Sequence, residues 1–445
     1  MSQRDPVVAV RRTTELGLMV LAGVVIGGAY VLAALGRSSS LPVNLVPFLV
    51  IILGLLVAAH MAVRKFAPGA DPLLLPLAGL LNGVGYVFVA RLRPDLAGFQ
   101  SLWTVLGIAA FVATLYLVPR TRNIERFRYT LGLFGIGLLL MPLLPVLGQN
   151  INGSRLWVRL GPVTFQPGEL SKIVLVVFFA SYLVEKRELL SMGTHQVAGM
   201  WLPEIRHLGP IVLAWSFSLV IMFFEKDLGS SLLFFALFIT MLWVVTARGI
   251  YLAIGGGMFV VGAVLAYTQF AHVRTRFSIW LNPWEVANDA GYQIIQALFA
   301  FAAGGIAGAN LGQGSPQRIP AVATDFTFAA IGEELGLLGT VAILACFILM
   351  VGAGLRIAMR AEPPFEKLLA TGLTAILGIQ SFIILAGVTR LIPLTGITLP
   401  FVSYGGSSLI SNYVLLALLL RISDDQAHRT GQAAGAQDAT QLGTR

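Results

Sequence analysis

The run PAVATDFTFAAIGEELGLLGTVAILACFILMVGA, residues 320–353, passes from a polar loop into an apolar segment. It carries Asp325 at the junction and Glu333 and Glu334 about two turns later. The apolar part is long enough for a helix that crosses the roughly 30 Å hydrocarbon core of a bilayer. Carboxylates at the edge of such a helix are energetically unfavourable and tend to mark functional sites. The stretch therefore predicts a membrane helix with a functional site near one end.

The composition is that of an integral membrane protein. The 445 residues are 57% hydrophobic and 11% charged, with a mean hydropathy of +0.83, whereas soluble domains carry about 25% charged residues. Apolar runs of about 20 residues fit spanning helices, while a β-barrel would show segments of about 10 alternating residues. We therefore expect an all-α polytopic membrane protein. The single cysteine, Cys346, excludes an intramolecular disulfide.

The hydropathy pattern predicts about twelve transmembrane helices. They fall at about residues 17–36, 44–63, 73–91, 100–119, 129–148, 170–186, 207–224, 229–247, 250–269, 328–353, 368–390 and 403–421. An even number places both termini on one side, and the segments of that side hold about 19 of the 30 Lys and Arg residues. We expect cytoplasmic termini and an extracytoplasmic loop at 270–327. Basic residues at helix ends favour membrane anchoring over nucleic-acid binding, despite the net charge of +9.

That topology places a group of carboxylates on the outer side of the membrane. Those at or close to the outer ends of helices are Glu169, Glu225, Asp227, Asp325, Glu333 and Glu334. We find no convincing internal repeat. A proton-coupled carrier would more often need ionisable groups near the midplane and two repeated halves. The pattern favours chemistry at the outer surface.

Asp325, Glu333 and Glu334 each allow two interpretations. Asp325 either caps the following helix by accepting a bond from a first-turn amide, or acts as a general base. A carboxylate that loses hydration at the membrane rim has a raised pKa and accepts protons more strongly. Glu333 and Glu334 point about 100° apart on a helix, so at most one can face a given cavity squarely. Both could instead lie in the headgroup layer.

A second group of candidate residues lies at 152–172. Glu169 and Lys172 are three residues apart at a predicted helix start, where they can form an ion pair. Lys172 could instead reach an anionic ligand. Trp157 lies between Arg155 and Arg159, which suits contact with a sugar ring and a phosphate but equally an interfacial anchor.

The loop 270–327 is far longer than usual connections and carries Arg276, Trp280 and Trp284. The tryptophans suit either a binding surface or an interfacial aromatic belt. The glycine-rich run GGIAGANLGQG, 304–314, matches neither a P-loop nor a dinucleotide fingerprint. Its glycines favour bends or close backbone approach.

Two further helix starts have local signals. Asp227 before LGSS is typical of a helix N-cap. The small residues of TLPFVSYGGSS, 398–408, suit close helix packing, although free amides there could also bind an anion.

Four motifs, in order, resemble the SEDS family of bacterial cell-wall proteins (shape, elongation, division and sporulation), which includes the RodA, FtsW and SpoVE types. They are NGSRLW with QPGELSK (152–172), EKDLGSS (225–231), WLNP with GYQIIQ and the glycine-rich run leading to TDFTFAAIGEELG (280–336), and LIPLTGITLPFVSYGGSS (391–408). Lys226 stands where the family usually has proline, and Asn310 where glycine is common. Residues 380–392 look closer to the RodA type.

The resemblance also implies a division of the chain, because the family typically has ten spans. We expect a cytoplasmic segment at 1–16, two additional helices at 17–72, a core at 73–421 that includes the loop 270–327, and a disordered cytoplasmic tail at 422–445. The role of the two additional helices does not follow from the resemblance.

Members of the family are understood as peptidoglycan glycosyltransferases that polymerise lipid II, a glycan joined through diphosphate to a polyprenyl lipid. The resemblance implies that Asp325 is the catalytic base that deprotonates the acceptor 4-hydroxyl, with inversion at the donor anomeric carbon. The other expected substrate contacts are Arg155, Lys172 and Arg276 for the diphosphate, Trp157 for the glycan, and Glu169, Asp227, Glu333 and Glu334 as polar groups of the cavity.

The resemblance further implies the bacterial cytoplasmic membrane and a class B penicillin-binding protein as partner. No Ser-x-x-Lys occurs, so the serine nucleophile pattern of penicillin-binding transpeptidases is absent. No cofactor is expected with certainty, and a divalent cation stays open. Two rival functions remain, a lipid II flippase and a non-catalytic scaffold that activates its transpeptidase.

Overall fold

A computed structural model of the chain describes residues 6–37, 45–145, 147–151, 154–161, 163–191, 195–197, 200–202 and 209–443. Asn152 and Gly153 of the first motif lie outside the described residues, as do the first five residues of the predicted N-terminal segment.

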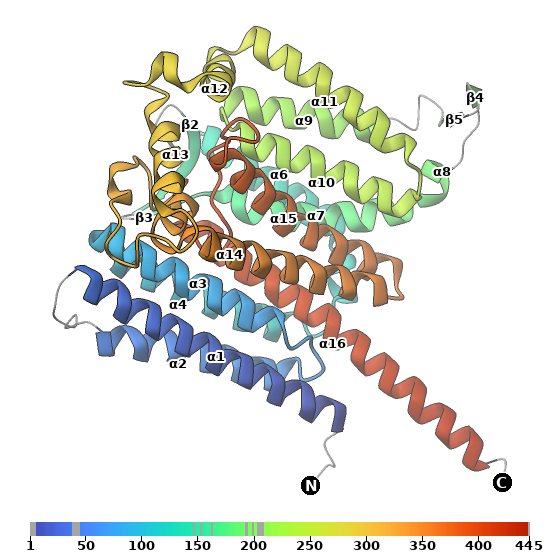
Figure 1. The fold of residues 1–445 in the computed structure, drawn as a ribbon. Helices are drawn as coiled ribbons and strands as arrows, with labels where there is room; N and C mark the ends of the chain where they lie inside the picture. The colour runs from blue at the N-terminus through green and yellow to red at the C-terminus, as the bar shows by residue number, and fades with distance from the viewer. Residues whose placement is uncertain are drawn as a thin grey trace.

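The architecture is a bundle of long helices (Figure 1). They are α1 (Pro6–Arg37), α2 (Leu45–Phe66), α3 (Leu74–Leu92), α4 (Pro94–Leu117), α6 (Arg128–Leu140), α7 (Pro167–Glu185), α9 (Gly209–Phe224), α10 (Leu228–Thr246), α11 (Ile250–Gln269), α14 (Thr327–Arg360), α15 (Pro364–Val388) and α16 (Gly406–Gly443). Among the described residues, one of these helices overlaps each predicted span, and nine helices are long and apolar enough to cross a membrane. Such helices satisfy their backbone hydrogen bonds internally, as lipid requires. The expected all-α polytopic membrane fold is confirmed.

Short elements connect the long helices. They are α5 (Arg122–Glu125), α8 (Arg187–Ser191), α12 (Ala271–Leu281), α13 (Tyr292–Gly304), the 3₁₀ turns η1 (Met141–Leu143), η3 (Pro283–Val286) and η4 (Pro316–Arg318), and the strands β1 (Gly148–Ile151), β2 (Ser154–Leu160), β3 (Val163–Phe165), β4 (His195–Val197) and β5 (Met200–Leu202). β1, β2 and β3 form one antiparallel sheet in that order, with Gln149 opposite Trp157 and Arg159 opposite Thr164. β4 and β5 form a separate hairpin. α12, η3, α13 and η4 all lie within the long loop 270–327, so much of that loop is helical.

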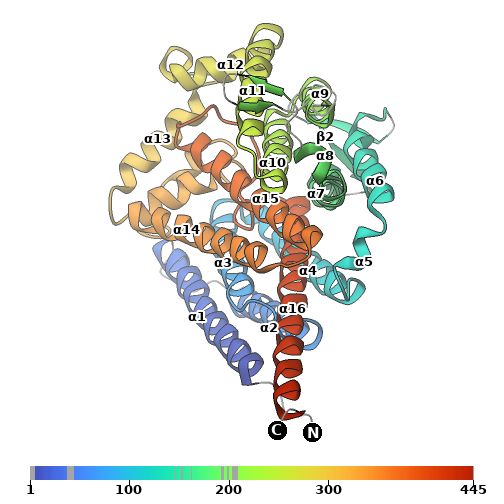
Figure 2. The same ribbon diagram turned by 90° about the vertical axis from the view of Figure 1, so that its right-hand side faces the viewer.

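The helices pack in pairs around an apolar core. α16 packs along α4, α14 along α15, and α6 along α7, while α1 contacts α3 and α2 contacts α4. α1 begins and α16 ends at one end of the bundle, whereas α12 and α13 lie at the other (Figures 1 and 2). We call these the terminal end and the loop end, and we call α1 and α2 the N-terminal hairpin.

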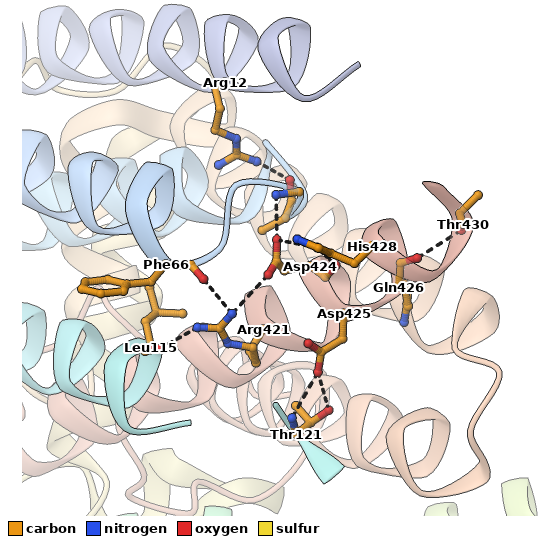
Figure 3. A network of polar contacts seen from close by, with 12 residues as sticks. Arg12, Phe66, Leu115, Thr121, Arg421, Asp424, Asp425, Gln426, His428 and Thr430 are labelled. Atoms are coloured by element: carbon orange, nitrogen blue, oxygen red, sulfur yellow. Dashed lines mark hydrogen bonds and ion pairs between the residues drawn. The ribbon is translucent and has the colours of Figure 1, made fainter. Parts of the chain in front are cut away.

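A group of polar side chains ties α16 to its neighbours at the terminal end (Figure 3). Arg421 donates to the carbonyl oxygens of Phe66 and Leu115, both at 2.6 Å, and to Asp424 at 3.1 Å. Asp424 also accepts the Gly69 amide at 2.7 Å. We call these five residues the terminal cluster. Because Phe66 ends α2 and Leu115 belongs to α4, the cluster joins three helices.

The N-terminal hairpin is attached beside the terminal cluster. Arg12 of α1, which Figure 3 shows near the terminal cluster, bonds to the carbonyl oxygen of Ala70. Arg12 also bonds to the carboxylate of Glu15. His60 Nδ1 of α2 lies 2.7 Å from Glu15 Oε1, and Glu15 is fully buried. These bonds hold both hairpin helices against the segment that leads into α3.

α16 continues as a helix through Gly443, which differs from the disordered tail predicted at 422–445. Asp425 accepts the amide and the hydroxyl of Thr121 at 3.1 and 2.9 Å (Figure 3). Arg429 donates to both carboxylate oxygens of Glu366, at 2.7 and 2.5 Å. These partners lie far away in the sequence, so the polar composition of the tail does not reveal them.

Candidate active site

A polar pocket of about 210 Å³ is lined in part by α12 and α13, the two helices at the loop end of the bundle (Figure 1). Its lining includes Asp325, Arg276, Trp280, Arg390 and Gly396. The first precedes α14, the next two belong to α12, and the last two follow α15. The fold thus brings together Asp325 and Arg276, two predicted site residues from different parts of the chain.

The backbone before α14 places Asp325 at the pocket. The Asp325 amide donates to the Ala321 carbonyl at 3.1 Å, and the Tyr404 amide holds the Ala323 carbonyl at 2.8 Å. The N-cap position of α14 is occupied by Phe326, and no side chain caps this helix. The helix-cap interpretation of Asp325 is therefore not supported. Its half-buried carboxylate lines the cavity instead.

Arg276 is fixed against the segment that follows α15. Its Nη1 donates to the Leu394 carbonyl at 2.5 Å. Gly396 has a φ of +77°, and a Cβ built on it would lie 3.6 Å from Arg276 Nη2 and 3.9 Å from Asp325 Oδ2. Because glycine adopts positive φ without steric cost, the chain can pass closely over both charged groups here.

Arg390 is a pocket residue that the sequence analysis did not single out. Its Nε donates to the Trp280 carbonyl at 2.7 Å and its Nη2 to the Leu281 carbonyl at 2.6 Å. Trp280 Nε1 donates back to the Arg390 carbonyl at 3.2 Å. These bonds tie the end of α12 to the end of α15. In the sequence, the available signal for Arg390 was its position at the end of the predicted helix 368–390.

The pocket couples a carboxylate of raised proton affinity to a permanent cation. Burial raises the pKa of Asp325 above its usual value, while a hydrogen bond from Thr324 and the charge of Arg276 oppose the rise. Burial lowers the pKa of Arg276, against the charges of Asp227 and Asp325. An arginine nevertheless stays protonated in proteins. A base and a cation therefore lie side by side.

Asp227 caps α10, which confirms the N-cap interpretation. The Ser230 amide donates to Asp227 Oδ1 at 2.9 Å, and the Ser230 hydroxyl donates to Oδ2 at 2.5 Å. Burial raises the pKa of Asp227, against these bonds and the charge of Arg276. Burial and the nearby Asp227 charge raise the pKa of Glu225 to about 9. Asp227 thus combines a structural bond with a place near the pocket cation.

Glu169 and Lys172 form a buried ion pair at the start of α7, which confirms the ion-pair interpretation. Lys172 Nζ lies 2.8 Å from Glu169 Oε2 and 2.8 Å from Gln380 Oε1. The Gln380 amide donates to the Thr398 carbonyl at 2.9 Å. No sequence pattern indicated Gln380, which lies 208 residues from Lys172.

Arg155 and Trp157 lie on β2, beside the turn between α9 and α10. The Arg155 amide donates to the Glu225 carbonyl at 3.3 Å, and its side chain is exposed. Trp157 is half-buried. Both lie outside the lining of the polar pocket, and their contact with a substrate stays a prediction.

Glu333 and Glu334 bind the backbone of the glycine-rich loop. Glu333 Oε1 accepts the Ser315 amide at 2.6 Å, and Glu334 Oε2 accepts the Gly312 amide at 3.0 Å. Arg91 of α3, which the sequence analysis did not single out, forms an ion pair with Glu334 at 2.8 Å. Neither glutamate lines the polar pocket. Their contact with a substrate also stays a prediction.

An apolar cavity of about 400 Å³ adjoins the polar pocket. Trp280 and Ile392 line both spaces. Trp215 of α9, Phe235 of α10 and Phe259 of α11 form other walls of the apolar cavity. A polar pocket beside an apolar cavity suits an amphiphile with a charged head and a hydrocarbon chain.

Across the described part of the chain, no three His, Cys, Asp or Glu side chains are grouped so that they could hold a metal ion. The cations that line the pocket are Arg276 and Arg390. A divalent cation stays a prediction.

Residues 94–428 match the sequence profile of the FtsW/RodA/SpoVE family, described as "Cell cycle protein". The chain belongs to this family. The match covers most of the chain and every motif on which the predicted resemblance was based, so the family prediction is confirmed.

Relatives within the FtsW/RodA/SpoVE family carry names that describe an enzyme. Peptidoglycan glycosyltransferase RodA of Mycobacterium tuberculosis is 44% identical over 429 residues, which cover 94% of this chain and 92% of that protein. Probable peptidoglycan glycosyltransferase FtsW of Geobacter metallireducens is 35% identical over 344 residues, covering 76% of this chain and 85% of that protein. The similarity to this RodA is both higher and longer.

Two solved structures share the fold. A chain from a peptidoglycan synthase complex described as coordinating polymerization and crosslinking has a TM-score of 0.64 and 27% identity, and covers 80% of this chain and 98% of that chain. RodA of Thermus thermophilus has a TM-score of 0.58 and 26% identity, and covers 80% of this chain and 97% of that chain.

The N-terminal hairpin precedes the residues that match the family profile, which begin at 94. The alignment with the M. tuberculosis RodA covers 94% of this chain, so it must extend into the hairpin. At least part of the hairpin sequence therefore aligns with that relative.

Proposed function

We propose that the chain is a peptidoglycan glycosyltransferase that polymerises lipid II, with Asp325 as its general base. Relatives at 44% and 35% identity carry the name of this activity. The observation that carries the assignment of the base is the half-buried Asp325 carboxylate beside Arg276 in a polar pocket.

The proposed reaction needs one proton acceptor and a site for a departing diphosphate. Asp325 takes the proton of the acceptor sugar's 4-hydroxyl as its oxygen forms a bond to the donor anomeric carbon. The bond between that carbon and the diphosphate oxygen breaks, and the electron pair leaves with the lipid diphosphate. Attack opposite to the leaving group inverts the anomeric carbon. The raised pKa of Asp325 strengthens it as the base.

Arg276 is the proposed contact for the diphosphate, because its guanidinium lies in the pocket beside the base. A cation preorganised where negative charge develops stabilises the transition state most effectively. Arg155 is the second proposed diphosphate contact and Trp157 the glycan contact, from the sheet beside the α9–α10 turn.

Asp227 and the Glu169–Lys172 pair are the remaining polar residues of the proposed site. Glu169 acts electrostatically on Asp227, and Asp227 acts on Arg276. Lys172 is already bonded to Glu169 and Gln380, so a direct contact with the diphosphate requires it to exchange a partner.

The adjoining apolar cavity is the proposed site for the polyprenyl chain. Its walls are apolar side chains of α9, α10 and α11, and it meets the polar pocket at Trp280. A lipid bound there would present its diphosphate toward Arg276.

We also propose the bacterial cytoplasmic membrane, with the loop end outside, the termini inside, and a class B penicillin-binding protein as partner. The excess of Lys and Arg on the terminal side supports this orientation. The similarity to a chain of a synthase complex that couples polymerization to crosslinking supports a transpeptidase partner.

The test compares wild type, Asp325→Asn and Asp95→Asn, each purified with a matched class B penicillin-binding protein and given labelled lipid II. Asp95 is exposed and paired with the exposed Arg93, so its variant controls for loss of a carboxylate. We expect glycan strands from wild type and Asp95→Asn, and a loss of at least about a thousandfold in Asp325→Asn.

Polymerisation by Asp325→Asn at the wild-type rate would remove this residue from the mechanism. Movement of lipid II across vesicles without polymer from wild type would assign a flippase. Transpeptidase activation with neither activity would assign a scaffold. Comparing EDTA with Mg²⁺ or Mn²⁺ in the same assay decides whether a divalent cation assists.

A further inference from the structure

The segment 305–315, which we call the glycine loop, connects two walls of the polar pocket. α13, which contributes Gln293 and Ile294 to the pocket, ends directly before it. Asp325 and the start of α14 follow it. The glycine loop therefore lies, along the chain, between two segments that line the pocket.

The glycine loop is built into a break in α14. Gly336 interrupts that helix with a φ of 64° and a ψ of −162°. The amides of Leu337 and Leu338, just past the break, donate to the carbonyls of Gly305 at 2.9 Å and Ile306 at 3.2 Å. We call residues 327–335, between Asp325 and this break, the entry helix. The loop holds the entry helix at its far end from Asp325.

The entry helix also binds the glycine loop through Glu333 and Glu334. The Ala309 amide donates to the backbone carbonyl of Glu333 at 2.8 Å, and the side chains of Glu333 and Glu334 accept the Ser315 and Gly312 amides. At Gly304 a Cβ would lie 1.9 Å from the Gly332 carbonyl oxygen. The end of α13, the glycine loop and the entry helix are therefore packed as one unit.

Arg91 pins this unit to the bundle. Its Nε and Nη2 lie 2.9 and 2.8 Å from Glu334 Oε1, and its Nη2 donates to the Gly314 carbonyl at 2.8 Å. The side chains of Arg91 and Glu334 are 9% and 0% exposed, so solvent does not screen the pair strongly. A guanidinium can hold a carboxylate and a carbonyl at once, whereas an ammonium is a point charge.

The N-terminal hairpin contacts the same loop from the other side. A Cβ on Gly36, near the end of α1, would lie 2.1 Å from the Leu311 carbonyl oxygen. Gly28, two turns earlier on α1, has nothing within 4 Å of such a Cβ. Gly28 is therefore a glycine of the same helix that lacks this tight contact.

We propose that Arg91 is a positioning residue of the active site, and that the N-terminal hairpin supports the glycine loop through Gly36. Both act through the unit formed by α13, the glycine loop and the entry helix, which sets where Asp325 meets the acceptor. The activity measurement rests on the proposed glycosyl transfer, whereas the exchange measurement does not.

The experiment uses full-length protein with Arg91→Gln and Gly36→Ala. The matched controls are Arg93→Gln, an exposed arginine on the same turn, and Gly28→Ala on the same helix. Hydrogen exchange is read at the amides that Glu333 and Glu334 hold, those of Ser315 and Gly312. We expect exchange there to be at least about tenfold faster in both test variants and unchanged in both controls.

Polymerisation of lipid II supplies the second readout. We expect kcat per folded enzyme to fall about tenfold to a hundredfold in Arg91→Gln, with KM within about twofold, because a small misplacement of a reacting group costs rate rather than binding. Arg91→Lys should recover part of the loss, since it keeps the charge but not the fork geometry. A merely structural role would lower the folded fraction and leave kcat unchanged.

Unchanged exchange and kcat in both test variants would overturn the proposal, as would faster exchange with wild-type kcat. If Arg91→Gln does not fold, Gly36→Ala alone decides between these outcomes. Absence of polymer from wild type would refute the proposed function, and the exchange result would still decide whether Arg91 and Gly36 hold the loop.

Discussion

Arg421 at the terminal end and Arg276 at the loop end both lie among carboxylates, but their surroundings differ. Arg421 donates to two backbone carbonyls and to Asp424, which is itself bonded to the Gly69 amide. Arg276 donates to the Leu394 carbonyl and lines a cavity together with Asp325. A cation enclosed by protein partners joins helices, whereas a cation that faces a cavity is available to a ligand. The terminal end of the bundle is therefore structural, and the loop end is the one suited to chemistry.

The largest expected effect is the loss of stability on breaking the terminal cluster. Arg421→Met leaves Asp424 buried beside two unpaired carbonyls, which we expect to cost about 3–5 kcal/mol of unfolding free energy. Thermal unfolding in detergent measures it, with exposed Arg64→Met as the control. Polymerisation per folded molecule should stay at the wild-type value. A stable Arg421→Met protein with lost activity would contradict the structural assignment of the terminal end.

The reverse pattern is expected at the loop end. Arg276→Gln should slow polymerisation about a hundredfold to a thousandfold, because a preorganised cation at the leaving diphosphate is lost. The midpoint of unfolding should change little, since Arg276 is only partly enclosed. Arg274→Gln, two residues earlier and exposed, is the matched control. Equal rates for the two variants would show that Arg276 does not contact the reacting groups.

The features that the sequence could predict are those set by neighbouring residues in the chain. Apolar runs specify membrane helices because length and hydropathy are local properties. Asp227 as a cap of α10 and the Glu169–Lys172 pair also follow from spacing within one turn. Both are present in the structure.

Contacts between distant segments could not be predicted in this way. Arg91 meets Glu334 across 243 residues, and Lys172 meets Gln380 across 208. Arg276 and Asp325 line the same pocket beside Gly396 only in the folded chain. No spacing rule within a helix links such residues. The carboxylate of the candidate site was therefore identified from the sequence, while its surroundings required the fold.

Lys172 lies between these two extremes, because it is buried and paired with Glu169, whose charge acts on Asp227 near the pocket cation. Lys172→Met and Glu169→Gln should each lower the free energy of unfolding. The double variant should lose about 2 kcal/mol less than the sum of the two single losses. Thermal unfolding of the four proteins measures this coupling. Additive losses would mean that the pair contributes nothing to stability as a pair.

The smallest effect concerns the pH dependence of polymerisation. The ionised form of Asp325 is the proposed base, so activity should fall as the pH drops through its pKa, which burial places above the usual value. The charge of Arg276 opposes that rise. Removing the charge should therefore raise the pKa of Asp325 further and move the acid limb of the pH profile to higher pH.

The pH profile of the residual activity of Arg276→Gln measures this shift, with Arg274→Gln as the reference. A shift toward lower pH would have the wrong sign for a carboxylate that loses a cationic neighbour. An acid limb that is identical in wild type and Arg276→Gln would mean that the group titrating in the reaction is not beside Arg276. Asp325 would then lose its assignment as the base, even if its replacement abolished activity. Because an adjacent cation must lower the proton affinity of a carboxylate, the direction of the shift tests the contact between the two residues independently of the size of the rate loss.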